Sequence, residues 1–232
     1  MTRFEEQLDA DQNGRILCVD KPEGWTSFDA VKKIRKQLRV KKIGHAGTLD
    51  PFATGLLLVC TGRATKQVEK LMELEKEYIG EIELGKVTDT YDKTGKILAT
   101  HDTSHVQLGD VTRVCWSFQG DLLQKPPMYS AVKINGERLY KLARQGKTVA
   151  RQPRKVKVYE IEILDFKNPI IELRIVCSRG TYVRSIAHDI GEKLGCGAHL
   201  KSLVRTRIGS YRLQNAHSIS DLIQTYENTF ES

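Results

Sequence analysis

The sequence predicts an α+β fold with a mixed, largely antiparallel central sheet flanked by helices. Short apolar or alternating runs between glycine and proline turns predict more strands than helices. Strands and helices do not alternate strictly, as they would in a parallel α/β fold. Hydrophobic residues make up 40% of the 232 residues, which is enough for a sizeable core, and no flexible linker divides the chain. We therefore expect a loose polar tail at 1–13 and a single domain at 14–232.

The first elements follow from local patterns. Residues 15–20 contain an apolar run that predicts a short buried strand, which ends in a turn at 21–24. Thr26 and Asp29 have the spacing of a capping box, which predicts a helix from Ser27 to about Arg39. Its apolar face is formed by residues at helical spacing: Phe28, Val31, Ile34 and Leu38. Its other face is a basic strip that points toward the glycine-rich loop: Lys32, Lys33, Arg35 and Lys36, continued by Lys41 and Lys42. Such a strip is either a solvated face or a phosphate contact.

The later elements follow from the same patterns of periodicity and turn residues. Up to residue 118 we expect a strand at 56–60, a helix opened by 62–66, a strand at 77–84, a polar loop at 85–92 and a weak helix at 110–118. Next we expect a strand at 128–134, a turn at Asn135-Gly136 and a short helix at 137–145 that is ended by Gly146. The last elements are strands at 156–166 and 170–177, a helix at 183–194 ended by Gly195, an extended stretch at 200–213 and a final helix from 220 to about 230.

A glycine-rich loop from Gly44 to Gly55 stands out in the chain. It holds three glycines and a single carboxylate, Asp50, and the apolar run 56–60 follows directly. Glycine density of this kind marks a loop whose path lets something come close to the backbone. Because Pro51 disfavours a helical conformation in the residue before it, Asp50 should be extended at the apex. Taken alone, this Asp-Pro is either a turn or a catalytic carboxylate.

The overall charge favours a polyanionic partner. Lysine and arginine total 37 against 29 aspartate and glutamate, a formal charge of +8, and nucleic acid is the first candidate, although many basic proteins bind nothing acidic. The five cysteines lack the spacing of a metal site and are expected to be reduced core residues. No apolar stretch approaches the roughly 18 residues that span a bilayer. We expect a soluble cytoplasmic protein with no metal and no membrane contact.

Residues 124–154 carry the strongest local charge imbalance. The only acid among them is Glu137. The cations are Lys125, Lys133, Arg138, Lys141, Arg144, Lys147, Arg151 and Arg154. A core segment would not carry this excess, so the segment is predicted to be an insertion that grips RNA.

Three separated motifs resemble the TruB family of tRNA pseudouridine synthases. They are the glycine-rich loop, the run Asp20–Ser27 before it and the run Arg179–Arg184 far after it, and the resemblance covers roughly Gly14 to Tyr211. It implies the pseudouridine synthase fold and isomerisation of uridine 55, in the T loop of tRNA, without metal or cofactor. Pro127–Ala131 is similar to the P-x-M-Y-S-A motif that opens the family's T-loop-binding lobe, with an extra proline at Pro126.

The resemblance also implies roles for individual residues. Asp50 would be the nucleophile, with Arg184 as the guanidinium that keeps it anionic. Tyr78 would stack on the flipped base and is a candidate for the late proton step. The remaining implied substrate contacts are His45, Tyr182, Leu203, Lys21 and Lys66, and those of the insertion are Lys133, Arg138, Lys141 and Arg144. Without the resemblance, Tyr78, Tyr182 and Leu203 are typical core residues. Whether Asp50 attacks the base or the ribose stays open, as does the choice between proton transfer and stacking for Tyr78.

Other functional classes fit less well. No G-x-x-x-x-G-K-[ST], G-x-S-x-G or H-E-x-x-H is present, which disfavours a P-loop, a serine hydrolase and a zinc protease. A non-catalytic RNA-binding module on the same scaffold is the alternative. Many family members continue into a small C-terminal RNA-binding domain resembling PUA, whereas this chain stops at Ser232. We therefore expect tRNA binding that is weaker, salt-sensitive and dependent on 124–154. Separately, we expect a monomer, and the sequence gives no evidence of a protein partner.

Overall fold

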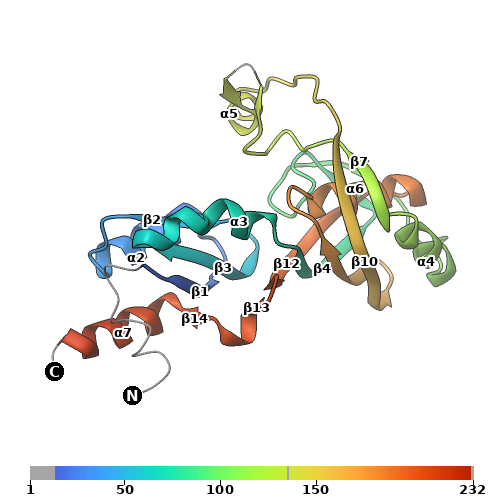
Figure 1. The fold of residues 1–232 in the computed structure, drawn as a ribbon. Helices are drawn as coiled ribbons and strands as arrows, with labels where there is room; N and C mark the ends of the chain where they lie inside the picture. Colours follow the sequence, from blue (N-terminus) through green and yellow to red (C-terminus); the bar gives the residue numbers. More distant parts are fainter. Residues whose placement is uncertain (1–13, 135, 231–232) are drawn as a thin grey trace. The chain divides into compact units, whose positions relative to one another are not determined.

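The computed structural model describes residues 14–134 and 136–230, so the predicted tail at 1–13 and Asn135 of the predicted turn lie outside the described residues. The chain divides into two compact units (Figure 1). Unit 1 is Met1–Glu77 with Val204–Ser232, and unit 2 is Tyr78–Leu203. The predicted single domain at 14–232, with an insertion at 124–154, stays a prediction. The predicted fold class is confirmed, because the strands form a large, mixed and mostly antiparallel sheet with helices.

Unit 1 is built on four strands in the order β14-β1-β3-β12, with β2 paired to β3 and β13 to β12. Its elements are β1 (Ile16–Lys21), α2 (Ser27–Gln37), β2 (Ile43–Ala46), β3 (Thr54–Thr61), the 3-10 helix η1 (Gly62–Gln67), α3 (Val68–Glu73), the end of β12 (Ala198–Ile208), β13 (Tyr211–Arg212), the 3-10 helix η2 (Leu213–Asn215), β14 (His217–Ser218) and α7 (Ile219–Phe230). Strands β1 and β3 run antiparallel, whereas β3 and β12 run parallel.

Strand β3 is buried on both of its faces. Leu57 and Val59 pack with the apolar side of α2, while Leu56 and Leu58 pack in a second cluster with Leu71 of α3. A strand covered on both sides reads as a continuous apolar run rather than an alternation, which explains the apolar run at 56–60.

Helix α2 begins as predicted but presents one residue differently. The Thr26 hydroxyl accepts from the Asp29 N–H, and the Asp29 carboxylate accepts from the Thr26 N–H, so the capping box is confirmed. Val31 and Ile34 are buried, yet Phe28 is 69% exposed, so its predicted inward orientation is wrong. Phe28 lies in the first turn of α2 and is not part of the core cluster. Ala30, which has a small side chain and lies two positions later, is packed in that cluster.

Unit 2 has its strands in the order β12-β4-β11-β10-β7. Its elements are β4 (Lys76–Leu84), β5 (Lys86–Thr88), β6 (Ile97–Thr100), α4 (Leu108–Trp116), β7 (Gly120–Gln124), β8 (Lys133–Ile134), β9 (Glu137–Arg138), α5 (Leu139–Arg144), β10 (Arg154–Lys167), β11 (Ile170–Cys177) and α6 (Val183–Leu194). Helix α6 has the predicted bounds, and its C-cap Gly195 adopts the predicted left-handed conformation, with φ of 76°.

Three predictions in unit 2 need correction. The polar loop at 85–92 contains strand β5, which pairs with β6. The strand predicted at 128–134 is limited to Lys133–Ile134, and the helix predicted at 137–145 begins only at Leu139. The reason is local: the carbonyls of Ser130 and Val132 accept from the N–H groups at the start of α5 rather than from a neighbouring strand. Among the helices that the structure describes, none has the length and apolar character to cross a membrane.

Candidate active site

The glycine-rich segment forms a shorter loop than the sequence suggested. Strand β2 ends at Ala46 and β3 begins at Thr54, so the loop proper is 47–53. Asp50 starts a β-turn, since its carbonyl accepts from the Ala53 N–H at 3.1 Å, and Pro51 occupies the second position that proline favours. Asp50 is half-buried at this bend. The rigid turn therefore fixes the direction in which the carboxylate leaves the backbone.

Lys21 ties this turn to the turn that follows β1. Its side chain is fully buried, and Nζ donates to the carbonyls of Pro22 and Trp25, each at 2.7 Å, and of Pro51 at 3.3 Å. The Gly24 N–H adds a backbone bond of 2.8 Å to the Pro51 carbonyl. All three Nζ hydrogens thus have acceptors inside the protein. Lys21 braces the Asp50 turn, and its substrate contact stays a prediction.

The burial of Lys21 predicts a pH dependence of stability. Burial lowers the pKa of the Lys21 amine from 10.5 to about 8, while the carboxylate of Asp50 raises it in part. Between pH 8 and 10.5 the unfolded chain holds this proton more firmly than the folded one, so the free energy of unfolding rises with pH there. We expect the difference in unfolding free energy, wild type minus Lys21→Met, to increase across this window in urea titrations. A difference that stays flat would contradict the assignment.

Ser27 and Arg205 fix the rest of the loop through hydrogen bonds to backbone groups. The Ser27 hydroxyl, at the start of α2, accepts from the Leu49 N–H at 2.9 Å. The Arg205 guanidinium, 1% exposed, donates from Nε to the Leu56 carbonyl at 2.7 Å and from Nη2 to the Gly47 carbonyl at 3.1 Å. It therefore joins the two ends of the loop. The sequence did not single out Arg205, because it lies in a run of alternating cations and nothing in the run distinguishes the buried one.

Gly55 is the position where a side chain is excluded. Its φ is +96°, and an added Cβ would lie 2.5 Å from the Arg205 carbonyl oxygen and 2.9 Å from the Arg205 nitrogen. Gly24 is a matched control, because its φ of +80° is similar but nothing lies within 4 Å of an added Cβ. We expect Gly55→Ala to lower the free energy of unfolding by about 3 kcal/mol or more and Gly24→Ala by about 1 kcal/mol. Equal losses in urea unfolding would show that the close approach to Arg205 carries no energy.

His45 and Lys66 complete the residues predicted in unit 1. His45 lies in β2 opposite Val59 and is half-buried. Burial, and then the charge of Arg205, lowers the pKa of the imidazole below its usual 6.5, so the ring is neutral at pH 7. Its Nδ1 is buried without a hydrogen-bond partner among the described residues. Lys66 is exposed in η1. A neutral ring can approach the apolar face of a base, which is compatible with the substrate contact predicted for His45.

In unit 2, the structure places Tyr78 and Leu203 together. Both line a small apolar pocket, with Val183 at the start of α6 among its other walls. Tyr182 is the N-cap of α6 and is held by Gln124, which is 5% exposed. The Gln124 amide accepts from the Tyr182 N–H at 2.7 Å and donates to its carbonyl at 3.0 Å. The sequence counted Gln124 only as the first residue of the insertion and missed this role.

Arg184 is buried in the first turn of α6. Its Nη1 lies 3.4 Å from the Asp92 carboxylate and donates to the Thr90 carbonyl at 3.0 Å, while Nη2 donates to the Tyr129 carbonyl at 3.0 Å. Asp92 is 4% exposed, and its other oxygen accepts from the Thr90 hydroxyl and from Thr94. The sequence missed Asp92. The feature that could have indicated Asp92 is the dense polar run 88–94 beside a glycine. The sequence predicted only a polar loop there, at 85–92.

The backbone of this polar loop is strained at Tyr91. Its φ is +64°, which is uncommon for a residue with a side chain. The Tyr91 ring stacks on His188 of α6, with centroids 3.9 Å apart and planes 7° apart, and its carbonyl accepts from the Leu200 N–H at 3.0 Å. These contacts hold the neighbouring Asp92 against Arg184.

The predicted insertion presents most of its cations outward, although Arg151 is half-buried and donates to the Pro126 carbonyl. Its four predicted RNA contacts are all exposed: Lys133, Arg138, Lys141 and Arg144. The guanidinium groups of Arg138 and Arg144 lie 6.0 and 5.6 Å from the centre of the Tyr140 ring. Leu139 is fully buried and anchors the start of α5. The segment thus forms a small hairpin and helix with a basic aromatic surface.

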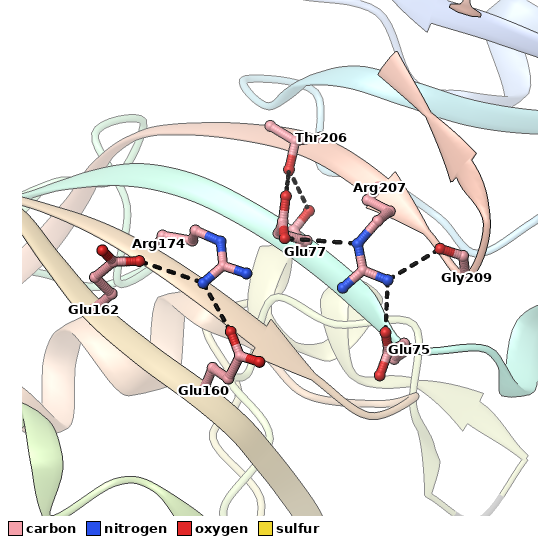
Figure 2. A network of polar contacts seen from close by, with 8 residues as sticks. All are labelled: Glu75, Glu77, Glu160, Glu162, Arg174, Thr206, Arg207 and Gly209. Atoms are coloured by element: carbon pink, nitrogen blue, oxygen red, sulfur yellow. Dashed lines mark hydrogen bonds and ion pairs between the residues drawn. The ribbon is translucent and has the colours of Figure 1, made fainter. Parts of the chain in front are cut away.

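Two further clusters of charge are internally neutralised. In unit 1, Arg207 contacts Glu75 at 2.5 Å and Glu77 at 3.6 Å, and donates to the Gly209 carbonyl (Figure 2). In unit 2, Arg174 lies 2.8 Å from Glu160 and 3.3 Å from Glu162 (Figure 2). These arginines balance carboxylates and are poor candidates for RNA contacts.

The predicted site residues are distributed over the two units. Asp50, His45 and Lys21 lie in the braced loop region of unit 1, and Tyr78, Tyr182, Leu203 and Arg184 lie in unit 2. The pairing of Arg184 with Asp50 stays a prediction. In 14–134 and 136–230, no three His, Cys, Asp or Glu side chains gather as a metal site requires.

Two family models match adjacent parts of the chain. The first, TruB family pseudouridylate synthase (N terminal domain), matches residues 35–183, and the second, tRNA pseudouridylate synthase B C-terminal domain, matches 184–232. The chain belongs to the TruB family. Family members of similar sequence include three proteins named tRNA pseudouridine synthase B. That of Clostridium tetani is 47% identical over 207 residues, which are 89% of this chain and 72% of the relative.

Two other TruB relatives are as close. The Dehalococcoides mccartyi (strain CBDB1) protein is 49% identical and is covered to 69% of its length, over 89% of this chain. The Opitutus terrae protein is 48% identical and is covered to 83%, over 87% of this chain. The resemblance predicted from the three motifs is therefore confirmed.

Solved structures share the fold. A chain in a Cbf5-Nop10-Gar1 complex superimposes with a TM-score of 0.75 at 33% identity, over 96% of this chain and 56% of that one. A chain in an H/ACA RNP bound to a substrate RNA containing 2'-deoxyuridine gives a TM-score of 0.73 at 30% identity, over 97% of this chain and 56% of that one. This chain spans little more than half the length of those two chains.

Proposed function

We propose that this chain is a tRNA pseudouridine synthase that isomerises uridine 55, in the T loop, with Asp50 as the nucleophile. The observation that carries the proposal is the Asp50 turn: a half-buried carboxylate on a loop held by the buried side chains of Lys21, Ser27 and Arg205 in a member of the TruB family. A loop that only connected two strands would not require three buried polar side chains to fix its path.

The reaction exchanges one bond of the substrate for another. The bond between ribose and the uracil nitrogen breaks, the base turns, and a bond to carbon forms, so the atoms balance within the nucleotide. The Asp50 carboxylate supplies the nucleophilic electron pair and leaves again at the end. Arg184, which Asp92 and two carbonyls hold rigidly, favours the anionic nucleophile when substrate excludes water.

The target base must leave its stack before Asp50 reaches it. Tyr78 and Leu203, which lie together in unit 2, would contact the flipped base, and Tyr182, whose backbone Gln124 fixes, would contact it as well. Tyr78 also carries a hydroxyl for the late proton step. His45, as a neutral ring, would replace the base in the stack, and Lys66 would add positive potential.

The substrate is tRNA, recognised at the T arm by a monomer of this chain in the cytoplasm. The exposed cations around Tyr140 support T-loop binding by 124–154, since a basic surface interleaved with an aromatic ring suits unpaired RNA. None of the five cysteines forms a disulfide, in keeping with a reducing compartment.

The direct test is incubation with unmodified tRNA transcripts, followed by mapping of pseudouridine along the strand. We expect one modified position in the T loop. A transcript with cytidine in place of that uridine is the matched control and should gain no pseudouridine. Modification at a different position would reject the T-loop assignment, and no modification of any transcript would reject the enzyme.

The insertion predicts a salt-dependent loss of affinity. Each phosphate contact contributes about 0.7–0.9 to the slope of log affinity against log salt, so replacing Lys133, Arg138, Lys141 and Arg144 by glutamine should lower the slope by about three. This variant tests the charges alone. Deletion of the whole segment would also remove Gln124 and, with it, the hydrogen bonds that hold the Tyr182 backbone. The dissociation constant for tRNA, measured across a salt series, checks it, and an unchanged slope would remove the insertion from the interface.

A further inference from the structure

The outer side of α2 combines an exposed aromatic ring with a row of cations. Phe28 is 69% exposed. Residues four and seven positions further along a helix lie on the same side, so Phe28 shares its side with Lys32 and Arg35, which are exposed. Lys33 and Lys36 are also exposed and widen this surface. We define the α2 face as Phe28, Lys32, Lys33, Arg35 and Lys36.

Helix α2 carries four cations and a single acid, Asp29, whose charge interacts with Lys32. The Asp29 carboxylate is also engaged by the cap, where it accepts from the Thr26 N–H at 3.0 Å. This distinguishes the α2 face from the arginine clusters at Arg174 and Arg207, whose charges are balanced by carboxylates. A phosphate backbone would supply the missing negative charge.

The α2 face is attached to the catalytic loop. Ser27 is the residue before Phe28, and its hydroxyl bonds the Leu49 backbone at 2.9 Å, one residue before Asp50. The Gly24 N–H, just ahead of the helix, donates to the Pro51 carbonyl at 2.8 Å. An RNA strand that presents a nucleotide to Asp50 therefore passes close to the first turn of α2.

At Lys33, the α2 face borders a groove of about 720 Å³ in unit 1. Lys33 and Gln37 line its α2 side, Trp25 lies in its wall, and the hydroxyls of Ser218 and Ser220 line the α7 side. Asp20 also lines it, so the groove is less basic than the helix surface. Amide, hydroxyl and aromatic groups beside a cation suit the sugar and base edges of a nucleotide.

We propose that the α2 face is a second RNA-contact surface, separate from 124–154, that binds tRNA phosphates through its cations and stacks an unpaired base on Phe28. The inference rests on the proposed function, because tRNA is the polyanion that the chain would handle. Exposure of a large aromatic ring does not stabilise the fold, whereas stacking of a base on such a ring strengthens binding. An acidic protein would pair with the cations but would not need the ring at their centre.

Two variants separate the ring from the charges. Phe28→Ser removes the stacking platform, and Lys32→Gln with Arg35→Gln and Lys36→Gln removes three cations. The matched controls lie in unit 2: Trp116→Ser removes an aromatic ring of similar exposure, 64%, and Lys157→Gln with Lys167→Gln and Lys193→Gln removes the same charge from exposed positions. The probe is an unmodified tRNA transcript, and its dissociation constant is measured across a series of salt concentrations.

We expect Phe28→Ser to weaken tRNA binding roughly tenfold with an unchanged salt slope. The triple α2 variant should weaken binding at least roughly tenfold at about 0.1 M salt and lower the slope by about two. Both controls should bind as the wild type does. Single-turnover rates at saturating enzyme should stay within about twofold of wild type, because the substitutions leave the Asp50 loop and its braces in place.

Binding by both α2 variants equal to that of the controls would overturn the proposal and leave the α2 face to a protein partner or to solvent. This outcome is distinct from failure of the proposed function. If the wild type is inactive but the α2 variants bind tRNA more weakly than it does, the RNA surface stands and the enzyme is rejected. If the wild type is active and the α2 variants bind as tightly as it does, the enzyme stands and the RNA surface is rejected.

Discussion

Asp50→Asn is expected to lower pseudouridine formation at least about 10³-fold while the dissociation constant for tRNA stays within about twofold. The amide keeps the size of the side chain, and asparagine suits the first position of a β-turn as well as aspartate does, so the loop held by Lys21 and Arg205 is preserved. What is lost is the anionic electron pair, and covalent catalysis has no substitute for it. Single-turnover rates on transcripts and filter binding measure the two quantities separately.

Asp121→Asn is the matched control, since Asp121 is an exposed carboxylate in β7. It should leave both the rate and the affinity unchanged. A non-catalytic RNA-binding module would show no turnover even as the wild type, which separates the alternative function from the proposed one. If Asp50→Asn forms pseudouridine at the wild-type rate, a different group is the nucleophile. The variant should also lower the pKa of Lys21 further, because the Asp50 carboxylate raises it.

Arg184→Gln is expected to reduce the rate of pseudouridine formation by about 10² to 10³ and the free energy of unfolding by about 3–5 kcal/mol. The substitution leaves the Asp92 carboxylate, 4% exposed, without its cation, and it removes donors from the carbonyls of Thr90 and Tyr129. A buried charge without a partner is far more costly than the pair is stabilising. Urea unfolding and single-turnover kinetics give the two effects.

A double-mutant cycle with Asp92→Asn isolates the pair. If the loss of stability comes from the uncompensated carboxylate, Asp92→Asn combined with Arg184→Gln should be more stable than Arg184→Gln alone. Activity should not recover in the double variant, because the guanidinium itself is missing. Additive losses of stability would show that Arg184 and Asp92 act independently, and recovery of activity would remove Arg184 from the chemistry.

Local patterns predicted most elements of the fold. The capping box at Thr26, the αL glycine at Gly195 and the doubly buried apolar run of β3 depend on residues close together in sequence, and each was found as expected. Predictions failed where a distant segment decided the outcome. Phe28 follows the helical period of an inward residue, yet the packing of α2 on its sheet leaves it in solvent.

The candidate site shows the same division. The Asp50 loop stood out by its glycines and its single carboxylate, and the 179–184 motif was identified by its resemblance to the TruB family. Gln124, Asp92 and Arg205 were not, because each acts through partners that lie far away in the chain: Gln124 and Tyr182 are 58 residues apart, and Arg205 and Gly47 are 158 apart. Polar residues in polar runs carry no sign of such pairing until the chain has folded.

The amino-acid sequence by itself indicated the fold class and the loop that carries the single carboxylate, because glycine, proline and apolar periodicity constrain the backbone locally, and its three motifs indicated the family by resemblance. Only the tertiary structure decided which charges are buried and which face solvent. Lys21 and Arg205 are buried and donate hydrogen bonds to backbone carbonyls, while the cations of α2 are exposed and accessible to a partner. The reason is physical: burying a charge is tolerated only where enough acceptors converge on it, and that convergence is a property of the folded chain.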